Sequence, residues 1–129
     1  MLDDVLDRAK PGSERGRVAE LMVAAHLTSR GWRVSFSPSD ASYDLLVEQS
    51  GRMLRVQVKT AYQRGSRGYN VFNTASGTAK SRHNYEDQAF DYFAVVVAGE
   101  GIFYVPQNAE WRHSKRVDDD MLTLTELQL

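Results

Sequence analysis

The 129-residue chain contains no cysteine, which excludes disulfide bonds, thiol nucleophiles and cysteine-based zinc sites. It also lacks an apolar run of about 18 residues, the length of a membrane span, so we expect a soluble protein without a membrane partner. Its first residues carry neither the basic segment nor the apolar core of a secretory signal, which predicts a cytoplasmic protein. The length suits one hydrophobic core, and we expect a single domain over residues 1–129.

Acidic residues are absent from one long stretch. Residues 51–85 contain no Asp or Glu but seven basic side chains, which are Arg52, Arg55, Lys59, Arg64, Arg67, Lys80 and Arg82. Since the net charge of the chain is −1, the remaining 94 residues carry a net charge of −8. Such segregation is typical of a surface that binds a polyanion. The alternative is a solvated loop that happens to be basic.

The order of elements predicts a sandwich of helix and sheet. A helix is expected over residues 13–30, with Gly31 in the left-handed position that follows it. Strands are expected over residues 32–36, 43–48, 53–60, 69–73, 90–98 and 102–106. The second and third of these form an antiparallel hairpin, and the apolar stretch 90–98 suits a central strand. This pattern predicts an α/β or α+β sandwich, in which the three aspartates 118–120 form a solvated turn rather than a metal site.

Glu20 is out of place in an apolar helix. Residues 18–27 are apolar at eight of ten positions, which indicates a helix that is apolar on both faces. A carboxylate in such surroundings must be paired, hydrogen-bonded or bound to a cation, because an unpaired buried charge is costly. Glu20 therefore forms an ion pair with Arg17 or Arg30, lies at the edge of the buried region, or contributes to a metal site.

The hairpin carries a second group of polar residues. Asp44 opens a strand although Asp disfavours strands, so its position needs a reason. On the next strand, the period of two places Gln57 and Lys59 on the face opposite Val58. The polar face of the sheet is the simpler explanation for these side chains. In combination with Asp44 and Glu20, however, they are the residue types that hydrolysis of a phosphodiester requires.

That chemistry needs a hard divalent cation and a positioned water. Asp44, Glu20, the Gln57 side chain and the Val58 main-chain carbonyl are oxygen ligands suited to Mg²⁺, for which Mn²⁺ is expected to substitute. Lys59 is the candidate that orients or deprotonates the water, or neutralises the developing charge. No glycine-rich phosphate loop follows a strand, so a nucleotide cofactor is not expected.

At these residues the chain resembles the PD-(D/E)XK nuclease superfamily. The helix acid of that family corresponds to Glu20, its aspartate to Asp44 and its lysine to Lys59, whereas Tyr43 and Gln57 depart from the motif. The Gln-x-Lys pattern is similar to the branch that contains group I intron homing endonucleases. The resemblance implies a restriction-endonuclease-like three-layer α/β sandwich, with a mixed central sheet flanked by helices.

The resemblance also implies a magnesium-dependent endodeoxyribonuclease acting on double-stranded DNA, with the residues around positions 64–83 in contact with it. The candidates for DNA binding are Arg64, Arg67, Tyr69, Lys80, Arg82 and His83. Because one small chain holds one site, cutting both strands is expected to require a homo-oligomer, either a dimer or a tetramer. Two alternatives are a Holliday junction resolvase-like nuclease and a catalytically inactive DNA-binding module of the same fold.

Overall fold

The computed structural model describes residues 5–6, 8–9, 13–38, 41–63, 68–76, 83–84, 89–108 and 110–128. The helices and strands with defined bounds are α2 (Ser13–Ser29), β1 (Arg33–Phe36), β2 (Leu45–Gln49), β3 (Arg52–Thr60), β4 (Tyr62–Gln63), β5 (Asn70–Asn73), β6 (Ala75–Ser76), β7 (His83–Asn84), β8 (Tyr92–Val97), β9 (Gly101–Pro106), β10 (Ser114–Arg116) and the 3₁₀ helix η1 (Met121–Thr123). The helix over residues 13–30 and the six strands predicted from periodicity are confirmed to within a few residues at their ends.

A mixed five-stranded sheet forms the centre of the fold. Its strand order is β1-β2-β3-β8-β9, in which β3 and β8 are parallel and the other neighbours are antiparallel. The turn between β2 and β3 has positive φ at both Ser50 and Gly51, the conformation that a tight hairpin needs. Strand β8 is almost completely buried, as its apolar sequence predicts. An α/β fold with a mixed central sheet is therefore confirmed.

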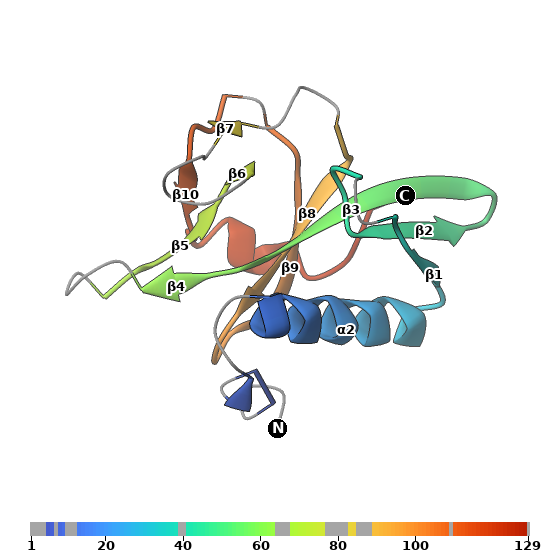
Figure 1. The fold of residues 1–129 in the computed structure, drawn as a ribbon, viewed down its shortest axis with the longest axis horizontal. Helices are drawn as coiled ribbons and strands as arrows, with labels where there is room; N and C mark the ends of the chain where they lie inside the picture. Colours follow the sequence, from blue (N-terminus) through green and yellow to red (C-terminus); the bar gives the residue numbers. More distant parts are fainter. Residues whose placement is uncertain are drawn as a thin grey trace.

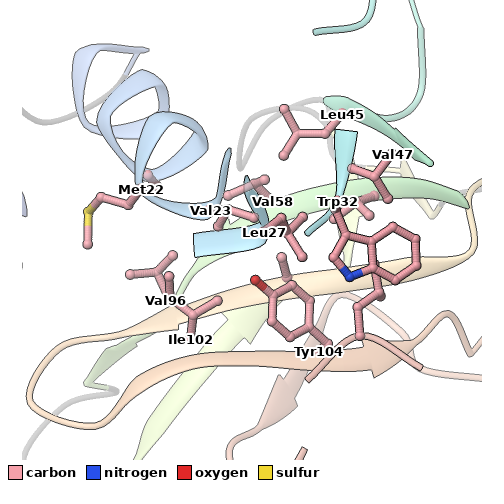
Figure 2. Packing of buried hydrophobic residues seen from close by; sticks show 14 of the residues in the cluster. Met22, Val23, Leu27, Trp32, Leu45, Val47, Val58, Val96, Ile102 and Tyr104 are labelled. Atoms are coloured by element: carbon pink, nitrogen blue, oxygen red, sulfur yellow. The ribbon is translucent and has the colours of Figure 1, made fainter. Parts of the chain in front are cut away.

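Helix α2 covers one face of this sheet (Figure 1). Figure 2 shows Met22, Val23 and Leu27 of the helix facing Val58 and other residues of the strands. The helix carries apolar residues on both faces as predicted, but only one face is buried, since Leu21 on its outer side is 48% exposed. The helix ends as predicted at Gly31, where φ is +89° and the Trp32 amide donates to the Leu27 carbonyl.

A second layer covers the opposite face. It contains the three-stranded sheet β10-β5-β4 and η1, and β4 follows β3 along the chain and continues its course (Figure 1). Its core comprises the aromatic and aliphatic residues Phe72, Phe90, Phe93, Val95, Val97, Phe103, Val105 and Met121. The strand β10 was not predicted from the sequence. Among the residues that the structure describes, none of the helices combines the length and hydropathy of a membrane span.

Candidate active site

Asp44 lies where the ladder between β2 and β3 ends. Its amide donates to the Val56 carbonyl at 2.9 Å, and its Oδ2 atom accepts a hydrogen bond from the Val58 amide at 2.8 Å. The side chain therefore takes the place of a further strand residue beside β3. This accounts for an aspartate at the start of a strand, because its carboxylate satisfies a backbone donor that β2 no longer reaches.

The Val58 carbonyl points towards the same edge of β3. In an extended strand the N–H and C=O groups of one residue point to the same side, and alternate residues point to opposite sides. The Val58 amide faces Asp44, whereas the amide of Ala61 bonds to β8. The carbonyl of Val58 is thus directed to the place where β2 has ended, beside the Asp44 carboxylate.

Glu20 on helix α2 lies close enough to Asp44 for that carboxylate to influence its pKa. The Oε1 atom of Glu20 lies 3.4 Å from Nη1 of Arg17, one turn earlier on the helix. The Arg17 guanidinium also lies over the ring of Phe36, with its Cζ atom 4.4 Å from the ring centroid. One of the two ion pairs considered for Glu20 is therefore present. It does not exclude a metal role, since the side chain of Glu20 is 24% exposed and that of Arg17 is 54% exposed.

The two carboxylates raise the cost of ionisation at this edge. Burial raises the pKa of Glu20, and the nearby Asp44 raises it further, while Arg17 acts in the opposite direction. Burial likewise raises the pKa of Asp44, against the hydrogen bond from Val58 and the charge of Lys59. A cation bound between these carboxylates would favour their ionised forms and so act against both increases in pKa.

Gln57 and Lys59 lie on the predicted face of β3. Both are half-buried, whereas Leu54, Val56 and Val58 are buried against the helix side of the sheet. Gln57 pairs with Phe93 of β8 in the parallel register. The Nζ atom of Lys59 donates to the carbonyl of Ala75 at 3.1 Å, which ties the end of β3 to the start of β6.

Most residues predicted to bind DNA lie outside the described part of the chain, namely Arg64, Arg67, Lys80 and Arg82. For His83 the structure describes the backbone, which pairs with Ser76. Tyr69 is half-buried, and the Arg116 guanidinium lies over its ring at 4.4 Å from the centroid. The assignment of these side chains to DNA binding stays a prediction.

One residue of the basic stretch is neutralised within the fold. The guanidinium of Arg55 lies against the Asp91 carboxylate, with Nε 3.3 Å from Oδ2, and the Arg55 amide donates to the same oxygen at 2.7 Å. The Asp91 amide in turn donates to the Arg55 carbonyl. The charge of Arg55 therefore helps to hold β3 and β8 together, and it is not available to bind a polyanion.

The donor set fits a cation that prefers oxygen ligands. Asp44, Glu20, Gln57 and the Val58 carbonyl offer oxygen atoms only, and this composition suits Mg²⁺, which keeps several waters. Within the described residues, three or more His, Cys, Asp or Glu side chains do not gather anywhere in a way that could hold a metal. A site here would thus rest on two carboxylates and on neutral oxygens.

The chain was compared with known proteins. The model of the PD-(D/E)XK endonuclease family matches residues 12–121, a span that includes every residue of the candidate site. Among solved structures, the chain is similar to the bacterial homing endonuclease I-Ssp6803I with a TM-score of 0.72 and 21% sequence identity, over 84% of this chain and 80% of the other. This likeness shows a shared fold. The search of curated proteins found no match. On the extent of the family match, the chain belongs to the PD-(D/E)XK endonuclease family.

Proposed function

We propose that this protein is a magnesium-dependent endodeoxyribonuclease that cleaves double-stranded DNA, in the manner suggested by its similarity to a homing endonuclease. The observation that carries the proposal is that Asp44, the Val58 carbonyl and Lys59 lie at one end of β3, with Glu20 close enough for Asp44 to raise its pKa. Membership of an endonuclease family supports the same conclusion.

In this proposal the protein holds the cation through Asp44, Glu20, Gln57 and the Val58 carbonyl. When bound, Mg²⁺ would polarise the scissile phosphate and lower the pKa of a water molecule. Gln57 in place of an acid leaves the site one negative charge short of the usual family motif. We therefore expect the site to bind the cation more weakly than it would with an acidic residue at position 57.

Lys59 supplies the positive charge next to the reacting phosphate. Its Nζ atom is held by the Ala75 carbonyl, which fixes the ammonium at the end of the strand. In this position the ammonium can orient the attacking water and stabilise the negative charge that develops on the phosphate. Because that charge is largest in the transition state, Lys59 should matter more for turnover than for binding.

The decisive experiment compares wild-type protein with Lys59→Met over a Mg²⁺ titration, on linear duplex and on a four-way junction. Arg33→Ala is the matched control, since the Arg33 side chain is 86% exposed on strand β1. We expect duplex cleavage by wild type and Arg33→Ala that a chelator stops, and none by Lys59→Met. Preference for the junction would favour a resolvase, and cleavage in chelator would refute the metal dependence.

Binding of duplex without cleavage at any Mg²⁺ or Mn²⁺ concentration would favour the inactive DNA-binding module. We further propose that the protein acts in the cytoplasm as a dimer or tetramer, because cutting both strands of a duplex requires two sites of this size. Sedimentation of the full chain with and without duplex tests the oligomeric state. A monomer that nicks one strand only would contradict it.

A further inference from the structure

We propose that the outer face of the small sheet β10-β5-β4, together with Arg112, docks the phosphate backbone of duplex DNA beside the cleavage site. We call this surface the β10 face and define it by Tyr62, Tyr69, Ser114, Arg116 and Arg112. The inference rests on the proposed function, since it takes DNA as the substrate. Besides Tyr69, which the sequence already indicated, it assigns binding to Arg112, Ser114 and Arg116, which the sequence pattern did not single out.

The strand register places Tyr62, Ser114 and Arg116 on one face of this sheet. Val71 of β5 pairs with Tyr62 of β4 on one side and with Arg116 of β10 on the other, so the three form a row across the sheet. The neighbouring pair, Phe72 and Lys115, must point the opposite way. Phe72 lies in the buried core, so the row containing Arg116 points away from that core; Val71 at its centre is only 2% exposed, whereas Tyr62 and Arg116 at its two ends are exposed.

The charges on this strand are divided between the two faces. Lys115, on the core side, pairs with Asp118 at 2.8 Å and lies 5.7 Å from the ring of Trp111. Within the described part of the chain, neither Arg112 nor Arg116 forms an ion pair, and both side chains are exposed. Asp118 is therefore engaged with Lys115 on the core side, while the exposed guanidinium groups of Arg112 and Arg116 stay available.

Arg116 is held in a geometry suited to phosphate. Its guanidinium lies over the Tyr69 ring, with Cζ 4.4 Å from the ring centroid. Contact with an aromatic face restrains the guanidinium while its N–H donors remain at the edges of the planar group, where they can meet a phosphate. Tyr62 in the same row is 47% exposed and can stack or donate a hydrogen bond.

This face is linked to the candidate active site by a short series of contacts. The Thr74 amide donates to the His113 carbonyl at 2.9 Å, beside the pairing of Ser114 with Asn73. The next residue, Ala75, accepts the hydrogen bond from Lys59. Strands lie about 4.8 Å apart, and each DNA strand carries a phosphate about every 3.4 Å along the axis. The β10 face would therefore meet phosphates a few nucleotides from the scissile bond.

The test measures binding of a fluorescent duplex to the full chain in chelator, where cleavage is prevented, over a range of salt concentrations. Arg112→Ala and Arg116→Ala are compared with wild type and with Arg33→Ala, which removes an equally charged, exposed side chain from strand β1. We expect each of the first two to weaken binding about 3- to 10-fold and to reduce the slope of log affinity against log salt by about 0.9. Arg33→Ala should leave both unchanged.

A further variant separates charge from geometry. Arg116→Lys keeps the charge and should keep the salt slope, but it should weaken binding because the planar, stacked donor group is lost. If wild type binds DNA and Arg112→Ala and Arg116→Ala do not alter the slope, or if Arg33→Ala alters it equally, the β10 face is wrong and the nuclease proposal stands. If wild type binds no duplex at all, both proposals fall.

Discussion

Arg17 and Glu20 form an ion pair one helical turn apart, with Nη1 and Oε1 separated by 3.4 Å, at the place where a metal ligand is expected. The Arg17 guanidinium thus partly neutralises Glu20 and lowers its pKa, while the nearby Asp44 carboxylate raises it. The guanidinium that helps to keep Glu20 ionised also repels an incoming divalent cation. These opposite effects lead to the first prediction.

Arg17→Ala is expected to tighten Mg²⁺ binding a few-fold at pH 8, where Glu20 is ionised without help. The effect is modest because Arg17 is more than half exposed and solvent screens its charge. Titration calorimetry measures the change, with Arg30→Ala as the control, since Arg30 lies just beyond the other end of the helix and pairs with Glu126. Equal affinities for Arg17→Ala and wild type would mean that Glu20 does not bind the cation.

The raised pKa values of Glu20 and Asp44 predict how stability depends on pH in metal-free protein. In the unfolded chain these groups titrate near 4.5 and 3.8, and in the folded protein they titrate higher. Between the two values the native state binds more protons than the unfolded state, so the free energy of unfolding falls as pH rises through this window. Below the pKa values of the unfolded chain, both carboxyls are protonated in the folded and in the unfolded state. They then do not change the free energy of unfolding.

Urea unfolding of wild type and of the double variant Glu20→Gln, Asp44→Asn in chelator checks this dependence. The difference between the two proteins should grow in favour of the variant from about pH 4 upwards and then level off. Saturating Mg²⁺ should restore the free energy of unfolding of wild type at higher pH, because the cation binds the ionised carboxylates. It should not stabilise the double variant. A difference that does not change with pH would contradict the raised pKa values.

Asp44 accepts a structural hydrogen bond from the Val58 amide, and its proposed role in binding the cation can be tested separately. Asp44→Ala leaves the Val58 amide without its acceptor, while it also removes a carboxylate that is costly to ionise. We expect a net loss of about 1–2 kcal/mol. Asp44→Asn keeps an acceptor oxygen and should lose less. Both should abolish cleavage, so an active Asp44→Asn protein would remove this residue from the metal site.

Gln57→Glu restores the acid of the family motif without changing side-chain length. The added charge should tighten Mg²⁺ binding and keep at least part of the cleavage activity, because a carboxylate is a better ligand for this cation than an amide. It should also raise the pKa of Asp44 further by repulsion between like charges. Weaker Mg²⁺ binding than wild type would show that position 57 does not face the cation.

The contact between Arg55 and Asp91 is expected to be the most important polar contact in the described part of the chain for stability. Asp91→Ala removes the acceptor of the Arg55 amide and guanidinium together, and we expect a loss of about 1–3 kcal/mol. Glu48→Ala breaks only the exposed pair with Arg33 at 3.6 Å and should cost less than about 0.5 kcal/mol. Chemical denaturation measures both, and equal losses would contradict the assignment.

Local patterns predicted the hairpin and the helix, and with them the residues of the candidate site. Asp44, Gln57, Val58 and Lys59 fall within sixteen consecutive residues, so period and turn chemistry fix their relative positions. The end of the helix at Gly31 could also be predicted, because the conformation of this glycine depends on neighbouring residues only.

Long-range contacts could not be predicted from such local patterns. Arg55 was counted with the basic stretch, although its charge is bound by Asp91 from 36 residues along the chain. Strand β10 escaped prediction because Ser-Lys-Arg has no apolar alternation, and it becomes a strand through pairing with β5. The basic residues Arg112 and Arg116 were missed for a related reason, since the acids of the same region cancel them in any count along the chain.

The hydrogen bond from Lys59 to the Ala75 carbonyl has a consequence for how binding and catalysis depend on each other. Ala75 begins β6, which pairs with β7 in a ribbon separate from the central sheet. A ligand that shifts the ribbon shifts the acceptor that holds the ammonium, and by thermodynamic reciprocity a change at Lys59 alters the affinity of the ribbon for that ligand. The position of the Lys59 ammonium therefore depends on the β6–β7 ribbon, which lies outside the central sheet.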